Sequence, residues 1–290
     1  MHYFRFTRTT SQYSRPYQQK FSNMTNLTIL ITGASGGIGK ATALRLAQPD
    51  IFSSSSSPSF KVHTLILHYN SANPETTKAL TTALNNLNSS IRVIWLQADL
   101  SCTSSVSTLC TAATSAAMSP INVLFLNAGT HLNHAGATTP SASGTLQNVD
   151  LDIFEKTWRV NALAPYHLTR TLVPDMLDHG FGRVIYTSSV AAMTGGVVGP
   201  HYSSSKAALH GMMHFLAKQY AGQGLTFNVV APALIADTAM LPGSEDELKK
   251  NIPVGRLGRP EEIAELVVPM IANGYISNKV WAADGGLVPQ

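Results

Sequence analysis

A tyrosine and a lysine stand four residues apart in the segment PHYSSSKAALHG, residues 200–211. If this segment is helical, Tyr202 and Lys206 lie on the same face of the helix. A free phenol titrates at about pH 10 and is a poor acid or base at neutral pH. A neighbouring ammonium stabilises the phenolate and lowers the pKa, so the pair predicts a group that transfers protons. The alternative is an exposed helix face without a chemical role.

A glycine cluster, TGASGGIG at 32–39, follows a short apolar run and opens a helical pattern. Its glycines allow a tight turn and a close approach of the backbone to a pyrophosphate, and the helix N-terminus offers N–H donors to that group. An ordinary strand–helix turn is the alternative, but the position after the first strand of the chain favours a nucleotide site. The residues expected to contact the cofactor here are Gly33, Ser35, Gly37, Ile38 and Gly39.

The elements that must position these residues follow an alternating pattern. Short runs rich in Val, Ile, Leu and aromatic residues are separated by helix-length segments such as 74–88, 103–118, 151–179 and 203–221. The runs are LTILITG, VHTLILHY, IRVIWLQADL, INVLFLNAG, GRVIYTSS, GLTFNVVAPA and NKVWAADGG. Buried strands that alternate with helices predict an α/β fold with a parallel sheet covered on both faces. We expect one doubly wound, Rossmann-type domain over residues 25–290.

Two segments interrupt the alternation. IFSSSSSPSF at 51–60 stands where a short turn would suffice, and predicts a flexible surface loop. The segment 131–149 follows the carboxyl end of a predicted strand, where ligands bind in such sheets.

Charge is concentrated at the N-terminus. Arg5, Arg8, Arg15 and Lys20 account for the whole net charge of +4, so the rest of the chain is neutral and offers no basic face to nucleic acid. Residues 1–24 contain no acidic residue and have the composition of a mitochondrial transit peptide. This predicts the mitochondrial matrix. The alternatives are a disordered extension or a later start of translation, with a cytoplasmic location.

Other compositional features exclude several classes of protein. No run reaches the ~18–20 apolar residues that a membrane span needs. Cys102 and Cys110 are too few and wrongly spaced for a zinc site or a disulfide framework, and we expect reduced thiols in an intracellular compartment. His210 and His214 share a predicted helix face, for which packing or a subunit contact is expected rather than a metal. His201 is expected to face outward, and we assign it no role.

Further motifs occur in a fixed order along residues 25–290. They are ADL at 98–100, NAG at 127–129, Asn161, Ser189, Tyr202, Lys206, GRLGRPEEIAE and DGG. With the glycine pattern TGxxxGxG, this series resembles the short-chain dehydrogenase/reductase family. The resemblance implies that Tyr202 donates a proton to a substrate carbonyl while Ser189 hydrogen-bonds the same oxygen. It also implies that Lys206 holds the nicotinamide ribose and that Asn161 holds a water that links Lys206 to solvent.

The resemblance assigns the remaining cofactor contacts to segments at the ends of the predicted strands. They are Asp99 and Leu100 beside the adenine, Asn127, Ala128 and Gly129 on the cofactor floor, and Ile235 and Thr238 near the carboxamide. In the last segment Ala233 replaces the family's glycine, and Thr238 lies one residue later than the family's threonine.

The end of the second strand decides between NAD(H) and NADP(H). NAD-binding relatives place a carboxylate there for the ribose 2′-OH, whereas this chain has Tyr69, Asn70 and Ser71. This favours NADP(H) over NAD(H), although Gly36 replaces an arginine that many NADP-binding relatives carry. Lys40 is the basic residue that follows in the sequence.

The region LPGSEDELKKNIPVGRLGRPEE is similar to that of β-ketoacyl-carrier-protein reductases of fatty-acid metabolism, which implies a ketone or 3-oxoacyl thioester substrate. His179 or Gly180, and Gln223, stand where bacterial relatives have arginines that dock the carrier protein. An NAD-linked alcohol, sugar or steroid dehydrogenase of the same family is one alternative, and a non-catalytic NADP-binding sensor or scaffold is another. Relatives are commonly tetramers, so we expect a homo-oligomer.

Overall fold

The computed structural model describes residues 25–49, 51–52, 60–132, 146–238, 241 and 244–289. The predictions for the basic head at residues 1–24, and for most of the segments 51–60 and 131–149, concern residues outside these ranges. Among the described residues, no helix is both long and apolar enough to cross a bilayer.

Seven strands form one sheet in the order β3-β2-β1-β4-β5-β6-β7, and every neighbouring pair is parallel. Each strand overlaps a run that the sequence analysis identified, although β1 and β2 begin two residues before their runs. The strands are β1 (Thr25–Ile31), β2 (Phe60–Tyr69), β3 (Arg92–Gln97), β4 (Val123–Leu126), β5 (Gly182–Thr187), β6 (Leu225–Pro232) and β7 (Lys279–Ala283). The predicted doubly wound parallel fold is therefore confirmed.

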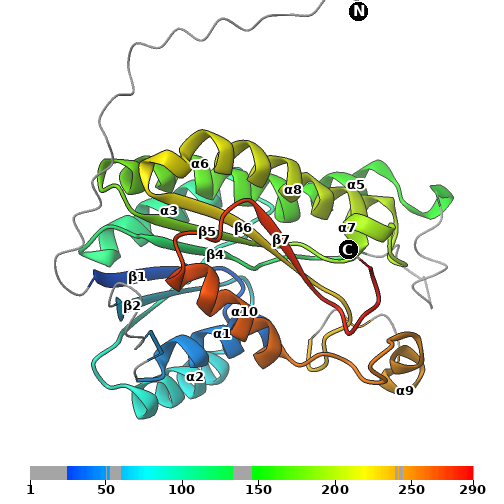
Figure 1. Ribbon diagram of the computed structural model, residues 1–290, viewed down its shortest axis with the longest axis horizontal. Helices are drawn as coiled ribbons and strands as arrows, with labels where there is room; N and C mark the ends of the chain where they lie inside the picture. The colour runs from blue at the N-terminus through cyan, green and yellow to red at the C-terminus, as the bar shows by residue number, and fades with distance from the viewer. Residues whose placement is uncertain are drawn as a thin grey trace, which may run out of the picture.

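Helices cover both faces of this sheet (Figure 1). One face is covered by α3, α6 and α8, and the other by α1, α2 and α10. The helices are α1 (Gly37–Ala47), α2 (Pro74–Leu87), α3 (Thr103–Ala117), α5 (Leu151–Trp158), α6 (Ala164–Asp178), α7 (Ala191–Thr194), α8 (Pro200–Tyr220), α9 (Glu245–Leu248) and α10 (Pro260–Ala272).

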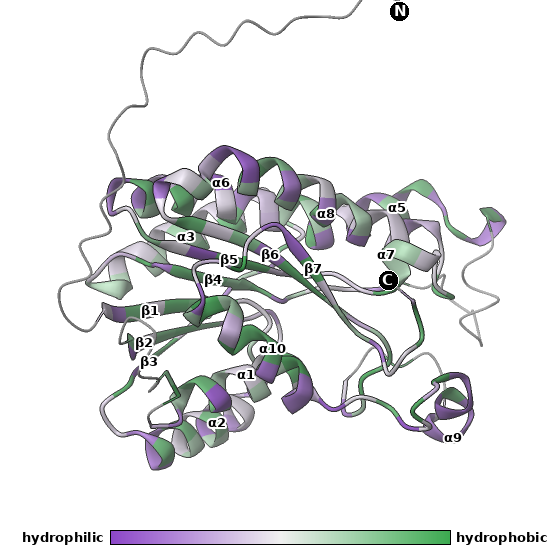
Figure 2. Cartoon of the chain, in the orientation of Figure 1, coloured by the Kyte–Doolittle hydropathy of each residue, from purple (hydrophilic) through white to green (hydrophobic). Residues whose placement is uncertain are grey.

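The central strands are buried because helices pack on both of their faces. All residues of β4, β5 and β6 are buried, whereas β3 and β7 at the sheet edges are half-exposed. Hydropathy follows the same pattern: green strands lie inside, and the short helix α9 is mostly purple (Figure 2). Continuous apolar strands of this kind are typical of parallel sheets.

The sequence analysis expected one helix over residues 151–179, but the structure divides this segment. α5 ends at Trp158, a π-helical turn spans Arg159–Leu163, and α6 begins at Ala164. Pro165 has no backbone N–H, so it cannot donate the helical hydrogen bond to the carbonyl of Asn161, four residues earlier. The bulge falls at this missing bond and places Asn161 inside the protein.

Candidate active site

A cleft opens at the carboxyl ends of the strands, around the point where β1 and β4 lie side by side. Its volume is about 1160 Å³, above the ~300–1000 Å³ of ordinary small-molecule pockets. The predicted site residues that line it are Gly33, Ser35, Gly37, Ile38, Asn70, Ser71, Asp99, Leu100, Asn127, Ala128, Gly129, Ser189, Tyr202, Lys206, Ile235 and Thr238. Gly39, Tyr69 and Asn161 were also predicted site residues, but they do not line it.

The glycine turn between β1 and α1 forms one wall of the cleft. Gly33 has φ of +66°, in the left-handed region that favours glycine. A Cβ atom on Gly33 would lie 3.0 Å from the Cα of Ala128. A Cβ on Gly39 would overlap the carbonyl oxygen of Gly33. Gly39 therefore acts by letting α1 pack closely on the turn rather than by lining the cleft.

The N-terminus of α1 faces this cleft without a side-chain cap. No side chain bonds the helix start at Gly36, and the first turn contains no acidic residue. The first N–H groups of any helix lack intrahelical acceptors, and here no capping side chain replaces them, while the helix dipole adds partial positive charge. Gly37 has no room for a side chain, because a Cβ there would lie 2.6 Å from the carbonyl oxygen of Asp237. These features fit the pyrophosphate of a dinucleotide.

The segment after β4 forms the floor of the cleft and is bonded to the glycine turn. The Asn127 Nδ2 donates to the Thr32 carbonyl (3.1 Å), and the Ala128 N–H donates to the Thr32 hydroxyl (3.0 Å). A Cβ on Gly129 would lie 2.9 Å from the Nζ of Lys206. A side chain at this position would therefore displace the end of the lysine.

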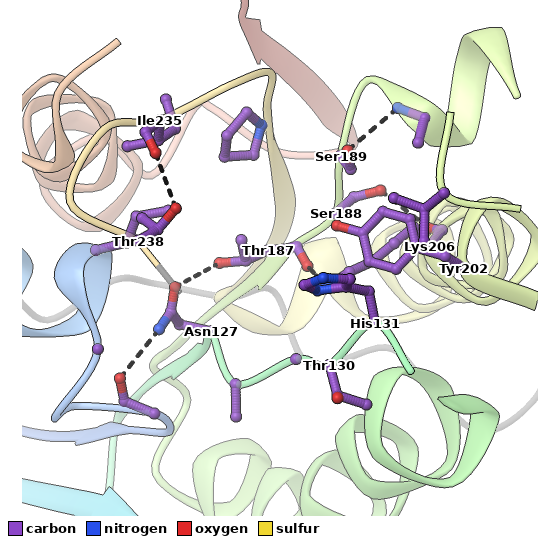
Figure 3. Close-up of a pocket in the computed structure, with 18 of the residues that line it drawn as sticks. Asn127, Thr130, His131, Thr187, Ser188, Ser189, Tyr202, Lys206, Ile235 and Thr238 are labelled. Carbon is purple, nitrogen blue, oxygen red and sulfur yellow. Dashed lines mark hydrogen bonds between the residues drawn. The ribbon is translucent and has the colours of Figure 1, made fainter. Parts of the chain in front are cut away.

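Tyr202 and Lys206 project from successive turns of α8, as the i, i+4 spacing predicted. The Lys206 Nζ lies 5.8 Å from the centre of the Tyr202 ring and donates to the Thr187 carbonyl at 2.8 Å. Lys206 is 2% exposed, and burial lowers its pKa to about 8. The ammonium therefore still predominates at neutral pH. Figure 3 shows this pair on the same side of the cleft as Ser188 and Ser189, with Ile235 and Thr238 opposite.

The predicted direction of the Tyr202 pKa shift is wrong. Burial raises the pKa of Tyr202, and hydrogen bonding by the neighbouring Ser189 hydroxyl only partly offsets this effect. The Lys206 ammonium is directed to the Thr187 carbonyl instead of the phenolic oxygen. Desolvation of the phenolate therefore outweighs the expected effect of the lysine.

Asn161 lies behind the floor of the cleft and is 1% exposed. Its Nδ2 donates to the Thr130 carbonyl (2.8 Å) and to the Ser205 hydroxyl (3.0 Å), while its Oδ1 accepts the Thr130 N–H (2.8 Å). The side chain thus joins the floor to α8.

Tyr69 does not face the cleft, because its ring packs edge-on against Trp95 at 5.8 Å between centroids. Asn70 and Ser71 do line the cleft. His68, which the sequence analysis did not select, lines it in place of Tyr69. A histidine directly after the apolar run Leu65–Leu67, at the carboxyl end of the strand, was the sequence signal that could have identified it.

The remaining predicted contacts come from two loops. The Asp99 carboxylate accepts the Ser101 N–H at 2.9 Å and lines the cleft together with Leu100. The Thr238 hydroxyl donates to the Ile235 carbonyl at 2.8 Å, so its oxygen can still accept a hydrogen bond from an amide.

His201 is fully buried rather than facing outward, and it lies inside α8. Its Nε2 lies 2.9 Å from the Leu132 carbonyl and must donate to it. This bond holds the segment that carries His131, a second cleft residue that the sequence analysis did not assign. The bond between His201 and Leu132 joins residues that are 69 positions apart in the chain, so no local pattern could predict it.

The family model described as short chain dehydrogenase matches residues 27–249. An uncharacterized oxidoreductase, YmfI of Bacillus subtilis, is 33% identical, with 90% of this chain and 98% of that protein covered. The 3-oxoacyl-(acyl-carrier-protein) reductase FabG of Aggregatibacter actinomycetemcomitans is 34% identical, with the same coverage. Among solved structures, a blue fluorescent protein from a metagenomic library in complex with NADPH matches with a TM-score of 0.75 and 30% identity. It covers 91% of this chain and 98% of that one.

Proposed function

The chain belongs to the short-chain dehydrogenase family, and from that membership we propose that it reduces a ketone to an alcohol with NADP(H). One observation carries the proposal. Ser189, Tyr202 and Lys206 line the same cleft as the uncapped N-terminus of α1. A proton donor and a phosphate-binding helix end thus belong to one continuous site.

A bound nicotinamide supplies the hydride to the carbonyl carbon. Tyr202 donates its phenolic proton to the carbonyl oxygen, which Ser189 holds by a hydrogen bond. Because burial raises its pKa, the phenol is protonated at neutral pH, as a proton donor must be. Lys206 then stabilises the phenolate that remains.

The phenolate must regain a proton after each turnover. Lys206 is the protonated group beside it, and its pKa of about 8 permits it to give up a proton near neutral pH. We assign the backbone carbonyl of Asn161 to a water that returns this proton from solvent. The amide of Asn161 keeps Thr130 and Ser205 in place around that path.

The preference for NADP(H) is supported by the polar groups at the end of β2. Asn70 and Ser71 line the cleft there, and neither would repel a 2′-phosphate. Among the described residues that line the cleft, Asp99 is the one carboxylate, and it follows β3 rather than β2. Solved structures that resemble this chain include one in complex with NADPH and one described as an NADH-dependent reductase, so the proposed preference depends on the residues at the end of β2.

An apolar ketone, such as a 3-oxoacyl thioester, fits the other part of the cleft best. The apolar residues that line the cleft include Leu132, Val160, Val197, Leu248 and Leu287. These side chains offer few hydrogen bonds to a sugar and much apolar contact to an acyl chain. The 34% identical 3-oxoacyl-(acyl-carrier-protein) reductase points to the same substrate class.

Initial rates with a panel of ketones test the proposal. A 3-oxoacyl thioester, a steroid ketone and a keto sugar are each assayed with NADPH and with NADH by nicotinamide absorbance. We expect the highest kcat/KM for the thioester with NADPH. A preference for NADH would favour the NAD-linked dehydrogenase, and no turnover with any ketone or alcohol would favour a non-catalytic sensor.

Replacement of Tyr202 by Phe tests the proton donor. Tyr202→Phe keeps the ring and removes the hydroxyl, so we expect kcat to fall by about 10²–10⁴-fold. NADPH affinity, measured by fluorescence titration, should change little. Near-normal turnover would remove Tyr202 from the role assigned to it.

Two further predictions concern the whole protein. We propose that residues 1–24 direct the chain to the mitochondrial matrix and that it assembles as a tetramer. A fusion of residues 1–24 to a fluorescent protein tests the first, with diffuse cytosolic signal as the contrary result. Light scattering of the purified protein tests the second.

A further inference from the structure

His68 is a buried side chain whose two ring nitrogens both contact backbone groups. It is 1% exposed and precedes the last residue of β2. The Gly33 N–H donates to its Nδ1 at 3.2 Å, and its Nε2 lies 3.0 Å from the Ala98 carbonyl. A carbonyl can only accept, so Nε2 carries the proton and Nδ1 the lone pair. The contacts therefore require the neutral ring in its Nε2–H form.

Both bonds join segments that come before and after β2 in the chain. Gly33 belongs to the glycine turn after β1, and Ala98 follows β3. The backbone carbonyl of His68 also accepts the Ala34 N–H at 2.9 Å. Two successive N–H groups of the glycine turn are thus held by this one residue.

We propose that neutral His68 is a positioning residue that sets the glycine turn for dinucleotide binding, and that its protonation weakens this binding. A proton on Nδ1 would place two N–H donors against each other at Gly33, so the turn would have to move. Gly33 lines the cleft beside Ser35 and Gly37, and any movement of the turn changes the phosphate site. The inference rests on the dinucleotide-binding part of the proposed function.

Few other titratable groups surround His68. β1 and β4 contain none, and His68 shares its own strand with Lys61, His63 and Tyr69. On the β3 side Asp99 follows Ala98, and α3, which packs on the same face of the sheet as Ile66, contributes Cys110. Burial lowers the pKa of His68, and the bond to Ala98 only partly offsets this effect. Protonation is therefore expected below the ordinary range of histidine.

Two substitutions separate the two bonds. In His68→Asn the side-chain oxygen takes the place of Nδ1 and can accept the Gly33 N–H without titrating. In His68→Gln the side-chain amide takes the place of Nε2 and can donate to the Ala98 carbonyl only. His63→Asn is the matched control, because His63 lies on the same strand with its side chain exposed and bonded to Thr64.

The measurement is the Kd for NADPH by fluorescence titration, at about pH 8 and about pH 5.5. We expect the natural protein and His63→Asn to lose about twofold to fivefold in affinity at the lower pH, because the lowered pKa of His68 leaves only part of the rings protonated there, and His68→Asn to lose much less. His68→Gln should bind about tenfold more weakly at both pH values. The 2′-phosphate of NADPH itself titrates at about pH 6. The comparison between variants removes this effect, because all bind the same ligand.

The ring form is read independently of any ligand from nitrogen-15 NMR of the imidazoles, with His68→Gln to assign the signals. We expect His68 as the Nε2–H form at pH 8. An Nδ1–H form, or an equal pH dependence of affinity in His68→Asn and the natural protein, would overturn the inference. A protein that shows the expected binding pattern but reduces no ketone would instead remove the proposed reaction and leave the role of His68 intact.

Discussion

Lys206 shows how a residue needed for chemistry works against the stability of the fold. It is a charged side chain with 2% exposure, and among the described residues it donates to the neutral carbonyl of Thr187. Burying an ammonium without a counter-ion is unfavourable, which is why burial lowers its pKa to about 8. The same position places the charge beside Tyr202, where a phenolate has to be stabilised.

Lys206→Met removes this buried charge while keeping a side chain of similar length. We expect the free energy of unfolding at about pH 7 to rise by roughly 1–3 kcal/mol and ketone reduction to be lost. Urea unfolding and initial rates measure the two effects. Lys218→Met, on the exposed side of the same helix, should change neither.

The stability gain expected for Lys206→Met should depend on pH, and the pKa of Lys206 gives the direction of that dependence. The pKa of Lys206 is about 8 in the folded protein and near 10.5 when unfolded. Between these values the unfolded chain binds more protons, so the natural protein becomes more stable as pH rises. The advantage of Lys206→Met should therefore shrink between pH 8 and about 10.5. An advantage that stays constant with pH would show that the charge is not its cause.

At the scale of elements, α1 and α8 place their glycines in contrasting surroundings. Gly39 in α1 packs directly on the glycine turn, where a Cβ would lie 2.8 Å from the Cα of Ala34. Gly211 in α8 has open space, with no atom within 4 Å of a Cβ position. The first glycine is required by packing, while the second only makes the helix more flexible before folding.

Alanine at these two positions should have opposite effects. Gly211→Ala is expected to raise the free energy of unfolding by about 0.5–1 kcal/mol and to leave kcat/KM unchanged. Gly39→Ala is expected to destabilise the protein and to weaken NADPH binding, because α1 must move away from the turn. Thermal unfolding with and without NADPH checks both. A Gly39→Ala protein with natural affinity would show that the close packing of α1 is not needed by the cofactor.

At the scale of the whole molecule, two hydrophobic cores lie on opposite faces of one sheet. Alternate residues of the same strand belong to different cores: Leu30 packs against one layer of helices, and Ile29 and Ile31 against the other. Among the described residues, burial lowers the pKa of four histidines: His68, His131, His201 and His210.

These histidines make stability depend on pH. Their folded pKa values lie below the unfolded value of about 6.5, so the unfolded chain binds more protons as pH falls through that range. The free energy of unfolding should therefore decrease as pH drops below about 6.5. Urea unfolding at about pH 7.5 and about pH 5.5 measures it. A stability that does not change over this interval would mean that the rings are not held neutral.

The sequence by itself determined the order of strands and helices, the glycine turn, and the placement of Tyr202 and Lys206 on one helix face. These features depend on local periodicity and spacing, which can be recognised in the sequence without knowing which distant residues are in contact. The bulge at Asn161 was not predicted, although Pro165, four residues later, is a local signal for an interrupted helix.

Only the tertiary structure decided which side of β2 faces the cleft. Successive side chains of a strand point to opposite faces, so a difference of one residue exchanges His68 for Tyr69. The partners of His68 lie 35 and 30 residues away, and that of His201 lies 69 residues away. The pKa of Tyr202 was decided in the same way. It depends on how completely distant segments exclude water from the phenol, and a spacing of four residues carries no information about that.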